Sequence, residues 1–463
     1  MRHLLVAGLA LAVLAAAPAP AAGDAPAPDP RAALDPHARQ LVDGEWCAGL
    51  VVGLVDADGG TRVLAWGETT RGGGQAPDGD TVFEIGSATK VFTSLLLADL
   101  VARKQVKLDT PVARLLPARV KLPRGKRAIT LLDLATHTSG LPRMPDNFTP
   151  ADLANPYADY TVDQLHAFLA GATLARQPGE AYEYSNLGAG LLGHALALRA
   201  KQPYEALVTE RITAPLGMKD TAITLSDGMR ARLAQGYDGD GEPARPWDLP
   251  TLAGAGALRS TANDLLRFLA VNLGHARPPG GALGRALALA QTPRRDADRP
   301  GERIGLGWHL HADGAVWHNG QTGGYHSYLA FHPARRVGVV VLASGGGQAI
   351  DDFGAAALAA AAGDEAPVLV LPASVAVPEK TLATYVGEYE LAPGFAIAVT
   401  RAGGRLYGQA TGQPRFRLFA RSPTAFALRV VEAEITFEID GKGRVTGLVL
   451  HQNGMDLPGR RKP

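Results

Sequence analysis

Cysteine is nearly absent from this chain, since Cys47 is the only one among 463 residues. A single cysteine forms no disulfide within the chain, so the fold is not a small disulfide-stapled module. Cys47 lies in the apolar stretch 46–55 without a cationic neighbour in sequence, which predicts a buried, unreactive thiol. Chemistry at an active site must therefore use other residues.

The chain also has almost no net charge, because 46 Lys and Arg residues balance 45 Asp and Glu residues to leave +1. This balance argues against nucleic acid or an anionic membrane surface as the main partner. The 55 glycines and 33 prolines show no short period, which argues against a collagen-like chain or a repeat array. A chain of this length has enough material for two or three domains.

Long apolar runs are scarce, and the one at residues 4–17 stands near the start of the sequence. It follows Arg2 and His3, is shorter than the roughly 20 residues that a spanning helix needs, and stops at Pro18. The pattern is typical of a secretory signal at 1–22, followed by a linker at 23–36. We therefore expect a periplasmic or secreted protein without integral membrane contact.

The order of the predicted elements indicates an α+β main domain over residues 37–362. Strand patterns occur near both of its ends, at 49–66 and 304–342, and the first strand of the second region is expected over 304–311. Helical spacing dominates from about 130 to 268, and a last helix follows at 349–362. This order predicts an antiparallel sheet flanked by helices beside a mainly helical region. Active sites favour such a junction.

A second, smaller domain is expected after a connection at 363–379 that is rich in Pro, Val and Ala. Short alternating segments separated by Gly-rich turns recur over 380–463, which predicts a small all-β sheet or barrel. A homo-oligomer formed through this domain is one open alternative for its role.

Three short patterns stand in order along the main domain: Ser87-Ala88-Thr89-Lys90, Tyr184-Ser185-Asn186 and His318-Asn319-Gly320. Each is weak alone, because such short patterns arise by chance. Their settings strengthen them: the first opens a predicted helix over 87–103, the second precedes a helix, and the third borders a predicted strand. We therefore interpret them as one set.

The first pattern provides a nucleophile and a base. Ser87 and Lys90 are three positions apart and share one face of a helix. Their apolar neighbours would desolvate the Lys90 ammonium and lower its pKa, which favours the free amine that can accept the serine proton. The backbone N–H groups of Ser87 and Gln321 could hold an oxyanion. Separately, Ser87 could be an N-cap and Lys90 a solvated lysine; the set favours catalysis.

The other two patterns supply the remaining groups. Tyr184 can act as a second acid or base, and Asn186 offers a donor and an acceptor to a substrate amide or to Lys90. His318 could donate a hydrogen bond or, when protonated, bind a carboxylate, and Gly320 lets a substrate approach the strand closely. The alternatives without a catalytic role are that Tyr184 is a buried aromatic residue, Asn186 a turn residue and His318 a residue of a surface loop.

Residues 83–90, together with the Tyr-x-Asn and His-x-Gly patterns, resemble the class C β-lactamase-like family, which includes penicillin-binding DD-peptidases, β-lactamases, D-aminopeptidases and esterases. Segments 128–141, 178–188 and 254–264 look like the same family, so the resemblance covers about residues 37–362. Tyr385-Val386-Gly387-Glu388-Tyr389 looks like the start of a small β-domain that is appended to some of these hydrolases, where it serves oligomerisation or substrate gating.

The resemblance implies the β-lactamase/DD-peptidase fold and an acyl-serine mechanism that needs no cofactor. Ser87 would attack a carbonyl, Lys90 and Tyr184 would move protons, and water would release the acid. The implied substrate is a small molecule or a peptidoglycan peptide, with a D-amino-acid amide bond or a β-lactam. One departure is His318, because class C β-lactamases usually carry a lysine in the third motif; a neutral histidine argues against efficient antibiotic hydrolysis.

Other functions remain open on the sequence alone. A carboxylesterase could use the same serine, lysine and tyrosine, and a penicillin-binding receptor could be acylated at Ser87 without turnover. An α/β-hydrolase is disfavoured because no serine stands in a G-x-S-x-G pattern. His309 and His311 would share one strand face, but no H-E-x-x-H pattern accompanies them, so we expect no metal site.

Overall fold

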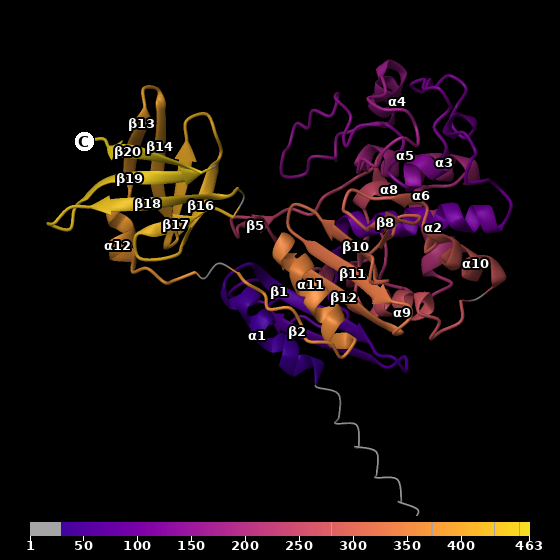
Figure 1. Ribbon diagram of the computed structural model, residues 1–463, viewed down its shortest axis with the longest axis horizontal. Helices are drawn as coiled ribbons and strands as arrows, with labels where there is room; N and C mark the ends of the chain where they lie inside the picture. Colours follow the sequence, from indigo (N-terminus) through magenta and orange to yellow (C-terminus); the bar gives the residue numbers. More distant parts are fainter. Residues whose placement is uncertain (1–28, 279, 372–373, 430, 453) are drawn as a thin grey trace, which may run out of the picture.

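The computed structural model describes residues 29–278, 280–371, 374–429, 431–452 and 454–463. The expected signal at 1–22 lies outside these residues. Figure 1 shows a larger body of helices and strands and a smaller all-β body at the C-terminal end. The α+β fold class with an appended all-β domain is thus confirmed. Within the described ranges, no helix is both long and apolar enough to cross a bilayer.

The larger body is built on an eight-stranded antiparallel sheet in the order β2-β1-β12-β11-β10-β9-β8-β7. The first two strands come from the start of the domain and the other six from its end, as the sequence predicts. The strands are β1 (Cys47–Val55), β2 (Thr61–Gly67), β7 (Arg295–Asp296), β8 (Arg303–Ile304), β9 (His309–Leu310), β10 (Val316–Gln321), β11 (His326–His332) and β12 (Val337–Gly345).

Helices cover both faces of this sheet, so its central strands β1 and β12 are buried along their whole length and read as apolar runs. On one face lie α1 (Pro30–Asp43) and α11 (Gln348–Ala361), which also pack against each other. On the other face lies α9 (Ala262–Asn272). Helix α1 begins at Pro30, inside the linker that the sequence analysis expects at 23–36. Leu34 is fully buried in the core, so this part of the expected linker belongs to the folded domain.

The middle of the domain forms the helical region beside the sheet. At its centre lies α2 (Thr89–Ala102), in which every side chain from Thr89 to Leu100 is buried among surrounding helices. The other helices are α3 (Leu131–Ala135), α4 (Val162–Gly171), α5 (Asn186–Ala200), α6 (Tyr204–Val208), α7 (Asp227–Ala231), α8 (Ala253–Gly256) and α10 (Gly281–Ala290), with a π-helical turn at Thr209–Thr213 and a 3-10 turn at Val112–Arg114. Two short antiparallel pairs join β3 (Phe83–Glu84) to β6 (Arg259–Ser260) and β4 (Gly236–Tyr237) to β5 (Pro243–Ala244).

Two local expectations differ from the structure. The helix expected over 87–103 begins later, because residues Gly86–Ala88 form a 3-10 turn, η1, before α2 starts. The strand expected over 304–311 is split into β8 and β9, since the chain turns between them and Gly305 N–H donates to Trp308 O (2.8 Å). Both interruptions lie beside the predicted site.

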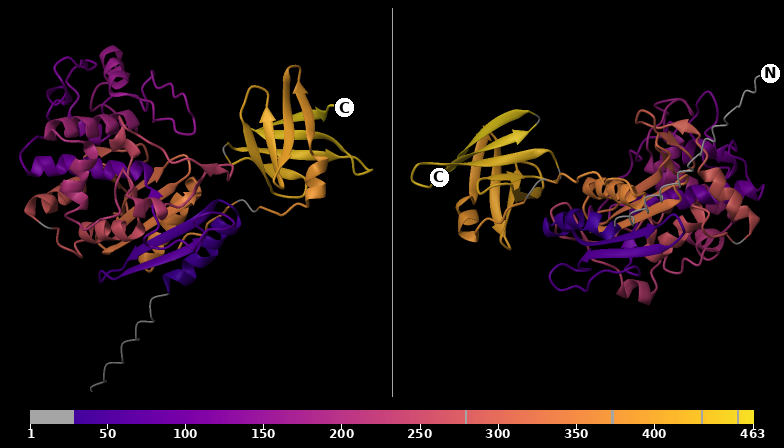
Figure 2. Two further views of the ribbon diagram at one scale, coloured as in Figure 1. Left: turned by 180° about the vertical axis from the view of Figure 1, so that it is seen from behind. Right: turned by 60° about the horizontal axis from the view of Figure 1, so that its bottom comes forward.

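The smaller body is a closed barrel of eight strands, preceded by α12 (Glu379–Thr384). Figure 2 shows it from two further sides. Its aromatic core includes Tyr385 stacked on Phe437 with ring centroids 4.1 Å apart. The strands are β13 (Gly387–Ala392), β14 (Phe395–Ala402), β15 (Arg405–Ala410), β16 (Arg415–Ala420), β17 (Ala425–Ala427), β18 (Ala433–Ile439), β19 (Val445–Gln452) and β20 (Met455–Arg461).

The barrel is anchored to the larger body by arginines. Arg417 forms an ion pair with Glu45 (2.6 Å), and Arg429 lies over the Trp46 ring, 4.0 Å from its centroid. The barrel also contacts the turn between β4 and β5, where Tyr407 donates to Glu242 (2.6 Å). That turn leads to Trp247, which lines the cavity described next.

Candidate active site

The three sequence motifs meet where β10 of the sheet faces the helical region. Ser87 lies in η1, Tyr184 in the loop before α5, and Gln321 at the end of β10. Together with Asn186 they line one cavity of about 740 Å³. Cys47 lies elsewhere, buried in β1, where burial raises the pKa of its thiol to about 12.

Lys90 is buried next to Ser87, with 2% of its surface exposed. Its Nζ lies 2.8 Å from Ser87 Oγ and 2.7 Å from the carbonyl oxygen of Ala255, which belongs to α8. Burial, and after it the charge of Arg143, lowers the pKa of Lys90 well below its ordinary value of 10.5. A neutral amine that donates to Ala255 has its lone pair available for the serine proton.

Tyr184 lies beside both Ser87 and Lys90, with its ring centroid 4.9 Å from Lys90 Nζ. Burial raises the pKa of Tyr184 to about 12, while the Ser87 hydroxyl and the charge of Arg143 act in the opposite direction. The phenol is therefore protonated at neutral pH and can donate a proton to a leaving group.

His137 fixes the position of Tyr184, a role that the sequence did not assign. Its ring stacks on Tyr184 with centroids 4.5 Å apart, and its Nδ1 accepts from the Ser185 N–H (3.1 Å). Its carbonyl oxygen accepts from Glu183 N–H (2.7 Å), so both neighbours of Tyr184 are held. Burial lowers the pKa of His137 well below 6.5, which keeps Nδ1 free to accept. In the sequence, the feature that could have indicated this role is that His137 lies in the family-like segment 128–141.

Close contact between η1 and β10 brings two backbone N–H groups together. A Cβ on Gly320 would lie 2.8 Å from Ser87 N, and one on Gly86 would lie 2.6 Å from Gln321 N. Thr322 N–H donates to Tyr325 O, and donors alternate along an antiparallel strand, so the N–H of Gln321 faces the opposite side of β10. That side is open, because β9 pairs only with Val316 and Trp317. These amides are positioned for an oxyanion.

We expect Gly320→Ala to disrupt this arrangement. The new Cβ would lie 1.9 Å from the carbonyl oxygen of Ile85, so β10 must move away from η1. Because one oxyanion donor is worth about 10²–10³ in kcat, we predict a loss of that size. Steady-state kinetics would measure it against Gly408→Ala, a strand glycine of the barrel whose Cβ has 3.4 Å to its nearest neighbour. Equal activity of both variants would contradict the close contact.

Asn186 and His318 do not make the contacts that the sequence analysis considered for them. Asn186 Nδ2 donates to the Tyr157 hydroxyl (3.4 Å) instead of to Lys90, and its Oδ1 has no protein partner among the described residues. His318 is fully buried, not in a surface loop, and burial together with His309 lowers its pKa well below 6.5. A neutral imidazole does not bind a carboxylate as an ion pair.

His309 and His311 do not act together. His309 lines the active-site cavity, where its Nδ1 lies 3.6 Å from Glu302 and its ring stacks on Trp317. His311 lies in a second cavity of about 670 Å³ beside α11, where it contacts Asp313 (3.1 Å). In the chain as described, His, Cys, Asp and Glu side chains form no cluster of three or more that could hold a metal.

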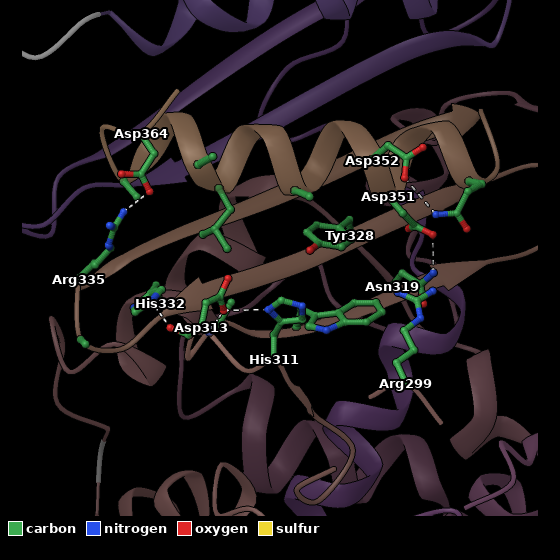
Figure 3. A pocket seen from close by; sticks show the side chains of 18 residues that line it. Arg299, His311, Asp313, Asn319, Tyr328, His332, Arg335, Asp351, Asp352 and Asp364 are labelled. Atoms are coloured by element: carbon green, nitrogen blue, oxygen red, sulfur yellow. Dashed lines mark hydrogen bonds and ion pairs between the residues drawn. The ribbon is translucent and has the colours of Figure 1, made fainter. Parts of the chain in front are cut away.

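The second cavity has a different character from the first (Figure 3). Several of its charged side chains have polar partners: Arg335 pairs with Asp364, and Asp351 accepts a hydrogen bond from Asn319 (2.7 Å). Ser87, Lys90 and Tyr184 do not line it. The candidate active site is therefore the cavity at η1.

A half-buried serine beside a buried lysine, a protonated tyrosine and two convergent amides define the site of a serine hydrolase with an active-site lysine. The family comparison agrees, since the model described as Beta-lactamase matches residues 34–364, more than half of the chain. The chain belongs to the β-lactamase family, and the resemblance seen in its motifs is confirmed. A second model, described as a domain of unknown function (DUF3471), matches residues 371–461, which include the barrel.

Individual relatives cover the same part of the chain. The D-alanyl-D-alanine-carboxypeptidase/endopeptidase AmpH of Escherichia coli (strain K12) is 33% identical over 327 residues, which are 67% of this chain and 82% of that protein. A β-lactamase of Pseudomonas fluorescens is 28% identical over 68% of this chain and 94% of its own. The crystal structure of a Yersinia pestis β-lactamase/D-alanine carboxypeptidase complexed with citrate has a TM-score of 0.60 at 28% identity, over 68% of this chain and 92% of that one.

Proposed function

We propose that this protein is an exported serine hydrolase that cleaves amide bonds of D-amino-acid peptides or β-lactams through an acyl-serine intermediate. The observation that carries the proposal is the buried Lys90 amine 2.8 Å from Ser87 Oγ. The named activities of AmpH and of the β-lactamase relatives support the substrate class. The apolar run at 4–17 supports export.

Acylation begins when Ser87 Oγ attacks the substrate carbonyl and its proton moves to the neutral amine of Lys90. The carbonyl oxygen becomes an oxyanion, which the N–H groups of Ser87 and Gln321 stabilise. The C–N bond then breaks as the leaving nitrogen takes a proton from Tyr184. Lys90 returns its proton to Tyr184, so both groups regain their starting states and the substrate acyl group is bound to Ser87.

Deacylation repeats the sequence with water in place of the serine. The amine of Lys90, directly or through Tyr184, removes a proton from water as its oxygen attacks the ester carbonyl. The same two amides hold the second oxyanion, and collapse of this intermediate returns the proton to Ser87 Oγ and releases the acid. Every group in the cycle belongs to the chain, so the proposed reaction needs no cofactor.

The test is release of D-alanine from a peptide that ends in two D-alanines, measured beside hydrolysis of a chromogenic cephalosporin. We expect turnover of at least one of them, and none of the matched peptide that ends in two L-alanines. Cleavage of p-nitrophenyl acetate, with neither D-peptide nor β-lactam turned over, would contradict the proposal and favour the carboxylesterase.

A further inference from the structure

Arg143 places an exposed positive charge at the mouth of the active-site cavity. Its guanidinium carbon lies 5.2 Å from the centroid of the Tyr184 ring. The loop that carries it is tied to the second motif, because Arg143 O accepts from Leu187 N–H (3.1 Å) and Pro142 O accepts from the Ser185 hydroxyl (2.6 Å). These bonds therefore hold the backbone of Arg143 beside the motif.

The surroundings of Arg143 supply no counter-charge. Its charge acts to lower the pKa values of the bases Lys90 and His137, and it opposes the rise that burial causes in the pKa of the Tyr184 phenol. Within the described ranges, no carboxylate lies within ion-pair distance of its side chain. Two carboxylates line the cavity: Glu302 is held elsewhere, by Trp317 (3.0 Å) and His309, and Asp298 forms no ion pair with Arg143. A guanidinium without an acidic partner that faces a cavity is available to an anionic ligand.

The third motif does not provide this charge. His318 is buried and neutral, so β10 presents no cation to the substrate. Arg299 also lines the cavity, but its charge acts on the nearby Glu302 carboxylate. Arg143 is thus the cation of the described cavity that contacts the Tyr184 ring and forms no ion pair with a carboxylate.

We infer that Arg143 binds the carboxylate of the departing D-amino acid, which makes the protein selective for C-terminal residues; this rests on the proposed function. Tyr184 protonates the leaving nitrogen, and the carboxylate of a terminal amino acid is only two bonds from that nitrogen. A guanidinium against the Tyr184 ring is therefore on the leaving-group side of the scissile bond. Its parallel N–H donors fit a carboxylate in a bidentate manner.

The experiment compares two peptides with the same scissile bond, one ending in D-Ala-D-Ala with a free carboxylate and one ending in its amide. We expect wild type to prefer the free acid, and Arg143→Gln to reduce the acid-to-amide ratio of kcat/KM by about 10- to 100-fold, mainly through KM. Arg143→Lys should retain part of the preference. The matched control is Arg245→Gln, because Arg245 is exposed, pairs with Asp152 and does not line the cavity.

Two results would overturn the inference. An equal loss for acid, amide and p-nitrophenyl acetate would show that Arg143 acts on proton transfer by Lys90 and Tyr184, and an unchanged ratio would show no carboxylate contact.

If wild type cleaves only esters, the proposed function fails, and the inference is tested with m-carboxyphenyl and phenyl esters of one acid. Arg143→Gln should then selectively impair the m-carboxyphenyl ester, and equal effects on both esters would reject it.

Discussion

Replacement of Ser87 by alanine is expected to abolish turnover of every substrate that the protein accepts. The side chain supplies the atom that becomes acylated, and among the described residues Ser87 is the serine or threonine whose hydroxyl forms a hydrogen bond with the buried Lys90 amine. Loss of a catalytic serine costs up to about 10⁶-fold in kcat, so we predict at least about 10⁴-fold. Initial rates on the D-alanyl peptide and on p-nitrophenyl acetate would measure the loss.

Ser94→Ala provides the matched control for this variant. Ser94 lies on α2 and is buried, at 3% exposure, but it does not line the active-site cavity. We expect both variants to keep the thermal midpoint of the wild type within a few degrees and only Ser87→Ala to lose activity. Comparable rates for the two variants would show that the nucleophile lies elsewhere.

Lys90→Met should have the second-largest effect, a loss of about 10³-fold or more in kcat/KM. Methionine has a similar length but cannot accept the proton of Ser87, so the attack loses its base. The substitution removes a buried amine that has no acidic partner, so we expect the free energy of unfolding to stay equal or to rise. Full activity of Lys90→Met would contradict the role of the amine.

The pH profile gives the same test without a substitution. A protonated Lys90 cannot accept a proton, so kcat/KM is lost as the pH falls through the pKa of Lys90 and is full above it. Because burial lowers this pKa well below 10.5, the ascending limb should lie well below pH 10.5. The phenol of Tyr184, with a pKa of about 12, remains protonated on the plateau. An ascending limb centred at 10.5 would indicate a solvated lysine.

Much of the fold follows from local patterns in the sequence. The apolar run of β1 and β12, and the helical spacing between them, already indicate a sheet formed by both ends of the domain. The alternating segments after residue 380 indicate the all-β domain, although closure into a barrel depends on the pairing of β13 with β20, which no local pattern specifies. The short strands β8 and β9 depend on a tight turn between them, and the sequence predicts a single strand there.

The candidate site was predictable where its residues form short motifs. Ser87 and Lys90 could be paired from their spacing, and the i, i+3 contact survives although Ser87 lies in a 3-10 turn. Contacts between distant segments were not predictable, because Ala255, His137 and Arg143 reach the motifs only through folding. The neutral state of His318 likewise follows from burial, which its sequence neighbours did not indicate.

The barrel has a structural link to the site that only the fold shows. Its strands β15 and β16 contact the turn between β4 and β5, where Arg417 N–H donates to Asp240 (2.8 Å). The segment after β5 continues to Trp247, whose N–H donates to Glu84 (2.9 Å) beside η1 and whose side chain lines the cavity. The position of one cavity wall is thus connected to the docking of the C-terminal domain.

The most direct test of the central mechanism is intact-protein mass spectrometry after exposure to a fluorescent penicillin. We predict one adduct in the wild type, with the mass of one penicilloyl group, that maps to Ser87 and is absent from Ser87→Ala. Fast decay of the adduct would agree with β-lactam turnover, and slow decay with a peptidase that the drug inhibits. An adduct of equal yield in Ser87→Ala, or one that maps to another residue, would contradict the acyl-serine mechanism.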